Sequence, residues 1–162
     1  MTELPFGLKG KIFRSAMPFG TYDPEGEILE EYQVNNVSVV VPLASVEECE
    51  EKAKRNLHQL YEKKGFDVIP LPVEDLAAPC KDAMAELIDN VISHAAFGRN
   101  VVVHCSAGQG RTGTFMACLA VTLLGLSGEE AIAWTREYIP GAVETPEQED
   151  LVREYTPKRK SL

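Results

Sequence analysis

A chain of 162 residues is long enough to bury a substantial hydrophobic core and short enough to form a single domain. Its 44% hydrophobic and 25% charged residues are typical of a globular protein, and its net charge of −9 argues against broad binding to nucleic acids or anionic membranes. The four cysteines show no metal-ligand spacing, so we expect no metal and a reducing compartment.

Strands and helices alternate along the chain after an irregular lead-in over residues 1–10. Short runs of β-branched and apolar residues predict strands over 11–15, 37–43, 66–71 and 101–103. Apolar residues at helical spacing predict helices over 27–34, 47–64, 81–97, 114–124, 128–138 and 145–155. The alternation predicts one α/β domain over 1–162, with a mainly parallel central sheet of about four to five strands flanked by helices. The basic tail, 157–162, is expected to lie in solvent.

No segment resembles a targeting signal or a membrane span. Met1 to Gly10 lacks the apolar core of a signal peptide, and the longest mainly apolar stretch, Thr114 to Leu126, is too short to cross a bilayer. We therefore expect a cytoplasmic protein with no membrane partner, and we expect a monomer.

One stretch, Val101 to Gly113, carries the chemistry and reads VVVHCSAGQGRTG. A buried strand leads into a loop of small residues and then into a helix. Such a loop lets successive backbone N–H groups turn inward as an anion nest, and the helix N-terminus adds unpaired N–H groups and partial positive charge. Arg111 can grip two oxygens, and the same positive field favours the thiolate of Cys105. We expect a phosphate or another oxyanion to bind Arg111 and the loop residues Ser106, Ala107, Gly108, Gln109 and Gly110.

The same stretch contains the signature H-C-x5-R-[ST], formed by His104, Cys105, Arg111 and Thr112. Through it the chain resembles the cysteine-based protein tyrosine phosphatases of the compact dual-specificity type, most strongly from about Ile69 to Tyr155. A nucleotide-binding P-loop is a near miss, because that motif has glycine where Cys105 stands and lysine where Arg111 stands. The resemblance implies a metal-independent phosphomonoester hydrolase that forms a cysteinyl-phosphate and needs no cofactor.

Such a reaction needs a proton donor for the leaving oxygen. The loop over residues 72–79 is the candidate, because it follows a predicted strand at the edge where α/β sheets place their sites. The resemblance carries the role of general acid to Asp75, with Glu74 as the next candidate. A turn or helix-capping role for Asp75 is the structural alternative.

Three more residues belong to the expected site. Thr112 is expected to donate a hydrogen bond to the cysteine sulfur, or else is an ordinary residue of the first helical turn, and His104 is expected to brace the loop through the backbone. The resemblance implies that Gln148 positions the hydrolytic water, but the run that starts at Thr145 is also typical of a capping box, and the two roles can coexist. Cys80 is a candidate for a protective disulfide with Cys105 under oxidation.

The substrate class is less strongly indicated. The loop over 106–110 contains no lysine, which argues mildly against inositide head groups, and the chain has no clear counterpart to the tyrosine-recognition loop of the classical domains. We expect a phosphorylated protein as substrate, with phosphotyrosine and also phosphoserine or phosphothreonine accepted. The alternatives are a phosphatase for a small phosphorylated metabolite, lipid or nucleotide, a phosphate-binding module without turnover, and a sulfur transferase of the rhodanese kind. Arg111 and the acid loop favour phosphate over sulfur chemistry.

Overall fold

A five-stranded sheet forms the middle layer, in the order β1-β2-β5-β3-β4. The strands are β1 (Thr2–Leu4), β2 (Ile12–Ser15), β3 (Val37–Pro42), β4 (Asp67–Val68) and β5 (Asn100–His104). β5 lies at the centre and pairs in parallel with β2 and β3, while β1 pairs antiparallel with β2 at one edge. The computed structural model describes residues 1–158. The predicted α/β domain with a mainly parallel sheet is confirmed.

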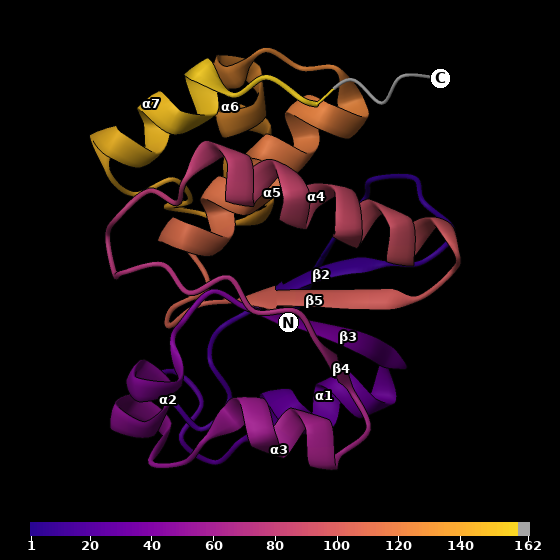
Figure 1. Ribbon diagram of the computed structural model, residues 1–162, viewed down its shortest axis with the longest axis vertical. Helices are drawn as coiled ribbons and strands as arrows, with labels where there is room; N and C mark the ends of the chain where they lie inside the picture. Colours follow the sequence, from indigo (N-terminus) through magenta and orange to yellow (C-terminus); the bar gives the residue numbers. More distant parts are fainter. Residues whose placement is uncertain (159–162) are drawn as a thin grey trace.

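Helices cover both faces of this sheet (Figure 1). They are α1 (Glu27–Val34), α2 (Val46–Ala53), α3 (Leu57–Lys63), α4 (Lys81–Ala96), α5 (Gly110–Leu124), α6 (Gly128–Tyr138) and α7 (Pro146–Glu154). Helices α1 to α3 lie on one side of the sheet, and α4 to α7 lie on the other. Each face therefore has its own hydrophobic core.

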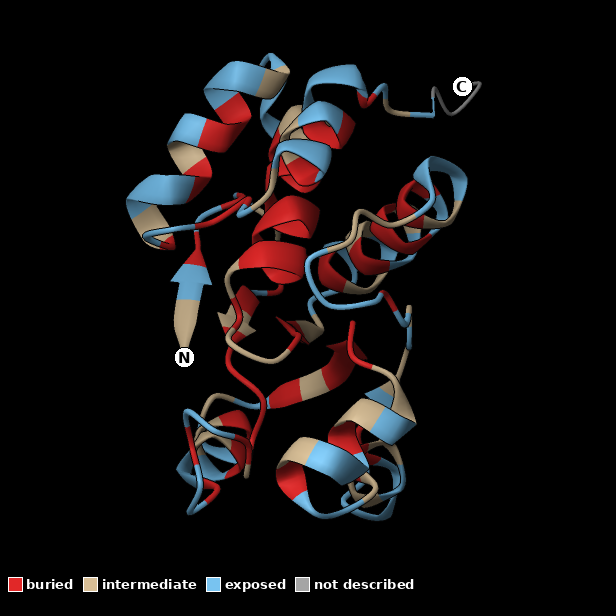
Figure 2. Ribbon diagram, turned by 90° about the vertical axis from the view of Figure 1, so that its left-hand side faces the viewer, coloured by how far each residue is buried: buried red, intermediate tan, exposed pale blue. Residues whose placement is uncertain are grey.

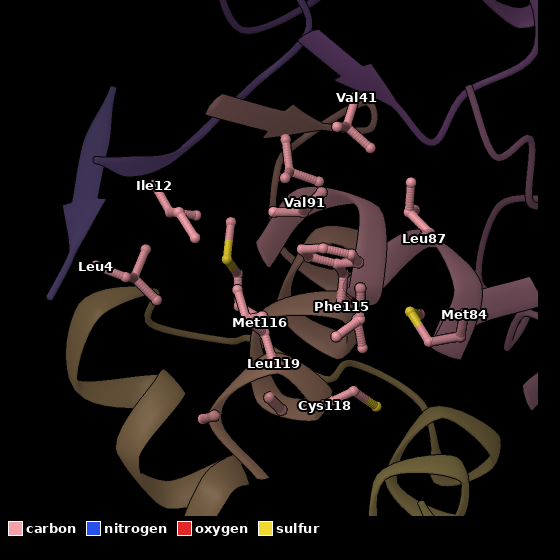
Figure 3. Packing of buried hydrophobic residues seen from close by; sticks show 14 of the residues in the cluster. Leu4, Ile12, Val41, Met84, Leu87, Val91, Phe115, Met116, Cys118 and Leu119 are labelled. Carbon is pink, nitrogen blue, oxygen red and sulfur yellow. The ribbon is translucent and has the colours of Figure 1, made fainter. Parts of the chain in front are cut away.

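The valine runs in the central strands follow from this double coverage. In β5, Val101 and Val103 pack into the core with α4 and α5, while Val102 points into the core with α1 to α3. Successive side chains of a strand alternate between faces, so a strand covered on both sides is apolar at every position. Figure 3 shows the larger core, in which Phe115 and Met116 of α5 lie among residues from the sheet and α4.

Helix α5 runs through the middle of this larger core. Every residue from Gly110 to Ala120 is buried, and this part of the helix is red in Figure 2. A helix that is apolar nearly all round has no face for solvent, so it must be enclosed by other elements. Its enclosure fixes the position of its N-terminus, which begins directly after the signature loop.

Three predicted elements differ from the structure. The lead-in is not wholly irregular, because β1 pairs with β2. The helix predicted over 47–64 is two helices, because Lys54 has a left-handed φ of 56° that ends α2 and the Asn56 side chain caps α3. The strand predicted over 66–71 is limited to the two residues of β4, and the chain then passes through the proline-containing loop.

Within residues 1–158, no single helix is long and apolar enough to cross a membrane, although α5 and α6 meet the criteria of length and composition as a pair bent by 119°. Most of the basic tail predicted over 157–162 lies outside the described residues.

Candidate active site

The signature loop connects the end of β5 to the start of α5. Among the described residues, no protein group accepts a hydrogen bond from the backbone N–H groups of Ser106 to Arg111. Cys105, at the start of the loop, is only 3% exposed. The loop thus presents unpaired donors next to a sulfur atom, as an anion nest requires.

Glycine is needed at the middle of this loop. Gly108 has a φ of +75°, a conformation that other residues adopt at a cost. A Cβ atom there would lie 2.2 Å from the carbonyl oxygen of Ser15 in β2. The N–H of Met17 also donates to the carbonyl oxygen of Ser106 at 2.9 Å, so the segment that follows β2 supports the loop from outside.

A cavity of about 230 Å³ opens over the loop. Its walls come from five separate parts of the chain: Thr21 and Tyr22 before α1, Lys52 of α2, Asp75 and Leu76 before α4, the signature residues Cys105, Ser106, Ala107, Gly110 and Arg111, and Glu144 before α7. The structure therefore brings Asp75 to the same cavity as Cys105, Arg111 and three more of the predicted phosphate-binding residues, Ser106, Ala107 and Gly110.

The Arg111 side chain is 1% exposed and is held by an acid that the sequence analysis missed. Its Nη1 and Nη2 atoms donate to the two carboxylate oxygens of Glu48 in α2, at 2.7 and 2.9 Å, and Nη1 also donates to the Val73 carbonyl oxygen at 2.8 Å. Burial by itself raises the pKa of Glu48, but hydrogen bonds from Arg111 and Lys52 outweigh this and lower the pKa to about 2. Glu48 therefore stays ionised and keeps the guanidinium in one orientation.

That orientation leaves a side of the guanidinium for a ligand. The Nη2 atom makes a second hydrogen bond, 3.1 Å long, to Oδ1 of Asp75. Within residues 1–158, Nε of Arg111 has no protein acceptor. An oxyanion that accepts a hydrogen bond from Nε and replaces Asp75 as the acceptor at Nη2 receives the bidentate contact that arginine makes with phosphate.

Asp75 is placed at the cavity, whereas its neighbour Glu74 is not among the residues that line it. The Asp75 side chain is 58% exposed, and its second oxygen lies 3.7 Å from Nζ of Lys52. Asp75 does not cap α4, because the N-cap position there belongs to Cys80. The geometry favours Asp75 over Glu74 as the acid that reaches a ligand above Cys105.

His104 lies beneath the loop and is fully buried. Its Nδ1 atom is 3.0 Å from the carbonyl oxygen of Cys105, and its Nε2 atom is 2.9 Å from the hydroxyl of Tyr61 in α3. Burial lowers the pKa of His104 to about 4, so the ring is neutral near pH 7. Because a carbonyl oxygen only accepts, Nδ1 carries the proton and Nε2 accepts from Tyr61. Tyr61 is a second residue that the sequence analysis missed.

Gln148 forms the capping box that the sequence predicted, together with Thr145. Its Oε1 atom accepts from the N–H of Glu144 at 2.8 Å, and its Nε2 atom donates to the carbonyl oxygen of Ala77 at 3.2 Å. Gln148 also lies beside the loop, since a Cβ on Gly110 would be 3.3 Å from its amide. It therefore connects α7 to the acid loop.

Thr112 and Cys80 are the remaining candidates from the sequence. The Thr112 hydroxyl is buried and has no hydrogen-bond partner among the described residues. Cys80 is exposed, lines a separate cavity together with residues of the acid loop, and is a free thiol like the other three cysteines. Among residues 1–158, no cluster of three or more His, Cys, Asp or Glu side chains is placed to hold a metal ion.

Comparison with known proteins identifies relatives of this chain. A family model described as a DSP-PTPase phosphatase of polymorphic toxin systems matches residues 18–124. The tyrosine-protein phosphatase cdc-14 of Caenorhabditis elegans is 35% identical over 121 residues, which are 75% of this chain and 16% of that protein. The protein MJECL20 of Methanocaldococcus jannaschii is 45% identical over 91 residues, which are 55% of this chain and 59% of that protein. The matched part of the chain thus spans less than two thirds of the length of each of these relatives.

Two solved structures share the fold over nearly the whole chain. The active form of Tk-PTP superposes with a TM-score of 0.77 and 27% identity, covering 94% of this chain and 95% of that one. A kinase associated phosphatase whose catalytic-site cysteine is replaced by serine superposes with a TM-score of 0.84 and 21% identity, covering 94% of this chain and 91% of that one.

Proposed function

The chain belongs to the DSP-PTPase phosphatase family, and on that premise we propose that it hydrolyses phosphorylated proteins, phosphotyrosine first, through a phosphocysteine at Cys105. One observation carries the proposal. The cavity joins a nucleophile, Cys105, an anion-binding loop with Arg111, and an acid, Asp75, that comes from a different loop. A module that only binds phosphate has no need of the nucleophile or the acid.

In the first step, the Cys105 thiolate attacks phosphorus in line with the leaving oxygen. The S–P bond forms while the bond from phosphorus to the ester oxygen breaks. Arg111 and the free loop N–H groups hold the other three phosphate oxygens as negative charge develops on them. Asp75 gives its proton to the leaving oxygen, which departs as an alcohol or phenol.

In the second step, water attacks the phosphocysteine. Asp75, now a carboxylate, accepts a proton from the water, the S–P bond breaks, and the thiolate is restored. The buried, unpartnered hydroxyl of Thr112 is assigned to donate to the departing sulfur. Gln148, next to Gly110, is assigned to orient the water, in addition to its capping role.

The substrate range, location and assembly belong to this proposal. Phosphoserine and phosphothreonine are proposed as further substrates, because the family model that matches residues 18–124 describes a DSP-PTPase phosphatase. A cytoplasmic location is supported by the free thiols of all four cysteines. We also propose that the protein is a monomer.

Hydrolysis of para-nitrophenyl phosphate tests the chemistry, in EDTA and reductant. The wild type should turn over, and Cys105→Ser should lose activity because the alcohol is a far weaker nucleophile at neutral pH. Asp75→Asn should be about 10²- to 10⁴-fold slower and lose the basic limb of its pH profile. Glu74→Gln is the matched control, since it removes the adjacent carboxylate away from the cavity.

A folded, reduced wild type without activity would refute the phosphatase proposal. If Glu74→Gln were the slow variant and Asp75→Asn behaved as wild type, the acid would have to be reassigned. A panel of phosphopeptides and small phosphorylated metabolites at matched concentrations then decides the substrate class. Preference for a metabolite, lipid or nucleotide would replace the protein substrate proposed above.

A further inference from the structure

Arg14 in β2 carries a charge that no protein group neutralises. Of the six arginines within residues 1–158, only Arg14 donates no hydrogen bond to another protein group. Its side chain is partly buried, and its Nε atom is buried without a partner among these residues. Burying a charged group without a partner lowers stability, so folding alone gives no reason for an arginine at this position.

The pairing of β2 with β5 places Arg14 on the face of the sheet that carries Cys105. In the parallel register, Arg14 lies opposite Val103, two residues before the cysteine (Figure 1). Paired residues of neighbouring strands share a face, and so do alternate residues of one strand. Ile12, Val103 and Cys105 all belong to the core with α4 and α5, and Figure 3 shows Ile12 pointing into it. Arg14 therefore extends from the sheet on the same side as the sulfur.

The signature loop packs against the same end of β2. A Cβ on Gly108 would lie 2.2 Å from the carbonyl oxygen of Ser15, which directly follows Arg14 in the strand. Burial lowers the pKa of Arg14, and the negative charge of Cys105 acts in the opposite direction. A guanidinium stays protonated in spite of such burial. The attraction is mutual, so a thiolate that favours the charged guanidinium is itself favoured by it.

The charged side chains on the cavity side of the loop do not favour a thiolate by themselves. Arg111 and Lys52 are the cations there. The carboxylates of Glu48 and Asp75 each form an ion pair with both of them. Glu144 adds a third carboxylate to the wall of the cavity. Two cations therefore face three acidic side chains around the nucleophile.

The other titratable groups beside Cys105 add no positive charge. Burial lowers the pKa of His104 to about 4, which leaves its ring neutral near pH 7, and Tyr22 at the cavity is a phenol. Among the described residues, the cation next to the sulfur that no carboxylate pairs with is therefore Arg14.

We propose that Arg14 is a positioning residue for the phosphatase reaction, and that its unpaired charge stabilises the Cys105 thiolate from the β2 side of the signature loop. The inference rests on the proposed function, because it concerns the nucleophile of that reaction. The same charge assists the second step, in which the S–P bond breaks and negative charge returns to the sulfur. A carboxylate partner for Arg14 would weaken both effects, which accounts for the absence of one.

Alkylation of Cys105 by iodoacetamide, followed by mass spectrometry, tests the proposal because the thiolate is the reactive form. Arg14→Met should react about three- to tenfold more slowly at pH 6, since loss of the cation disfavours the charged sulfur. At pH 9.5, where thiols ionise without help, the two rates should agree within about twofold. Cys80, an exposed free thiol of the same chain, is the internal reference and should react equally in both proteins.

Further variants separate the charge of Arg14 from its packing. Arg14→Lys should restore most of the rate at pH 6 because it keeps the charge, whereas Arg14→Gln should resemble Arg14→Met. Arg153→Met is the matched control, since it removes an exposed arginine of α7 that lies outside the cavity. In urea, Arg14→Met should be at least as stable as the wild type, because an apolar side chain replaces a charge without a partner.

An unchanged rate at pH 6 in both Arg14→Met and Arg14→Gln would overturn the proposal. Equal slowing at pH 6 and pH 9.5 would also overturn it, because access to the sulfur and not its ionisation would then have changed. So would equal slowing in Arg14→Lys and Arg14→Met. Alkylation requires no turnover, so the expected pattern in a protein that fails to hydrolyse para-nitrophenyl phosphate supports the role of Arg14, and only the phosphatase proposal fails.

Discussion

Replacing Glu48 by Gln removes the charge that holds the buried guanidinium of Arg111. The side chain of Glu48 is 14% exposed and accepts from both terminal nitrogens of Arg111 and from Lys52. In the variant, Arg111 stays buried with the exposed Asp75 as its remaining acidic partner. Removing one partner of a buried ion pair is costly because the other charge is left without compensation.

The size of the effect follows from the pKa of Glu48. Lowering that pKa from 4.5 to about 2 corresponds to about 3 kcal/mol of stability at neutral pH. Residual exposure and the amide oxygen of glutamine, which still accepts one hydrogen bond, reduce this value. We expect Glu48→Gln to lower the free energy of unfolding by about 2 kcal/mol at pH 7.

The sign of the pH dependence is also determined. A carboxyl whose pKa is lower in the folded state binds fewer protons there than in the unfolded state, so its contribution is complete above its unfolded pKa. The contribution declines as the pH falls from about 4.5 towards 2. The difference between wild type and Glu48→Gln should therefore shrink to less than half at pH 3.

Urea denaturation at pH 7 and pH 3 measures both quantities. Glu51→Gln is the control, because Glu51 lies on the same helix and is exposed. Equal midpoints for Glu48→Gln and wild type at pH 7 would refute the reasoning. A difference that is unchanged at pH 3 would also refute it, because the effect would then not depend on the charge of Glu48.

Three further substitutions test other parts of the site. Gly108→Ala should lower kcat/KM for para-nitrophenyl phosphate at least about tenfold, because the added Cβ meets backbone at a left-handed φ, and a variant with wild-type kinetics would contradict this. Thr145→Ala should lower the free energy of unfolding by about 1 kcal/mol in urea, since it loses the cap of α7 and the contact with Leu76, and unchanged stability would mean that the cap is dispensable. Tyr61→Phe should cost about 1–3 kcal/mol in the same assay, because Nε2 of His104 loses its donor while buried, whereas a stabilised variant would show that this hydrogen bond is not needed.

Several elements follow from local sequence alone. The helices over residues 27–34 and 128–138 have the bounds that their apolar spacing predicts. The capping box at Thr145 is present as its residue pattern predicts. Between α2 and α3 the local pattern is misleading, because Cys49, Ala53, Leu57 and Tyr61 share an apolar face at helical spacing although two helices carry them. The spacing of apolar residues indicates which side chains are buried. It does not reveal a turn between two helices when the side chains before and after the turn pack into the same core.

The sequence by itself determined the oxyanion loop, since Cys105 to Arg111 are consecutive and their backbone geometry depends on small residues followed by a helix N-terminus. The partners of Arg111 were decided only by the tertiary structure. Glu48 is 63 positions away in the chain and Asp75 is 36 positions away. They meet Arg111 because β3, which α2 follows, pairs with β5, and because β4, which precedes the acid loop, pairs with the other side of β3. A contact of this kind depends on the order of the strands in the sheet and on the path of the loops. Neither can be predicted from the residues that flank the arginine in the sequence.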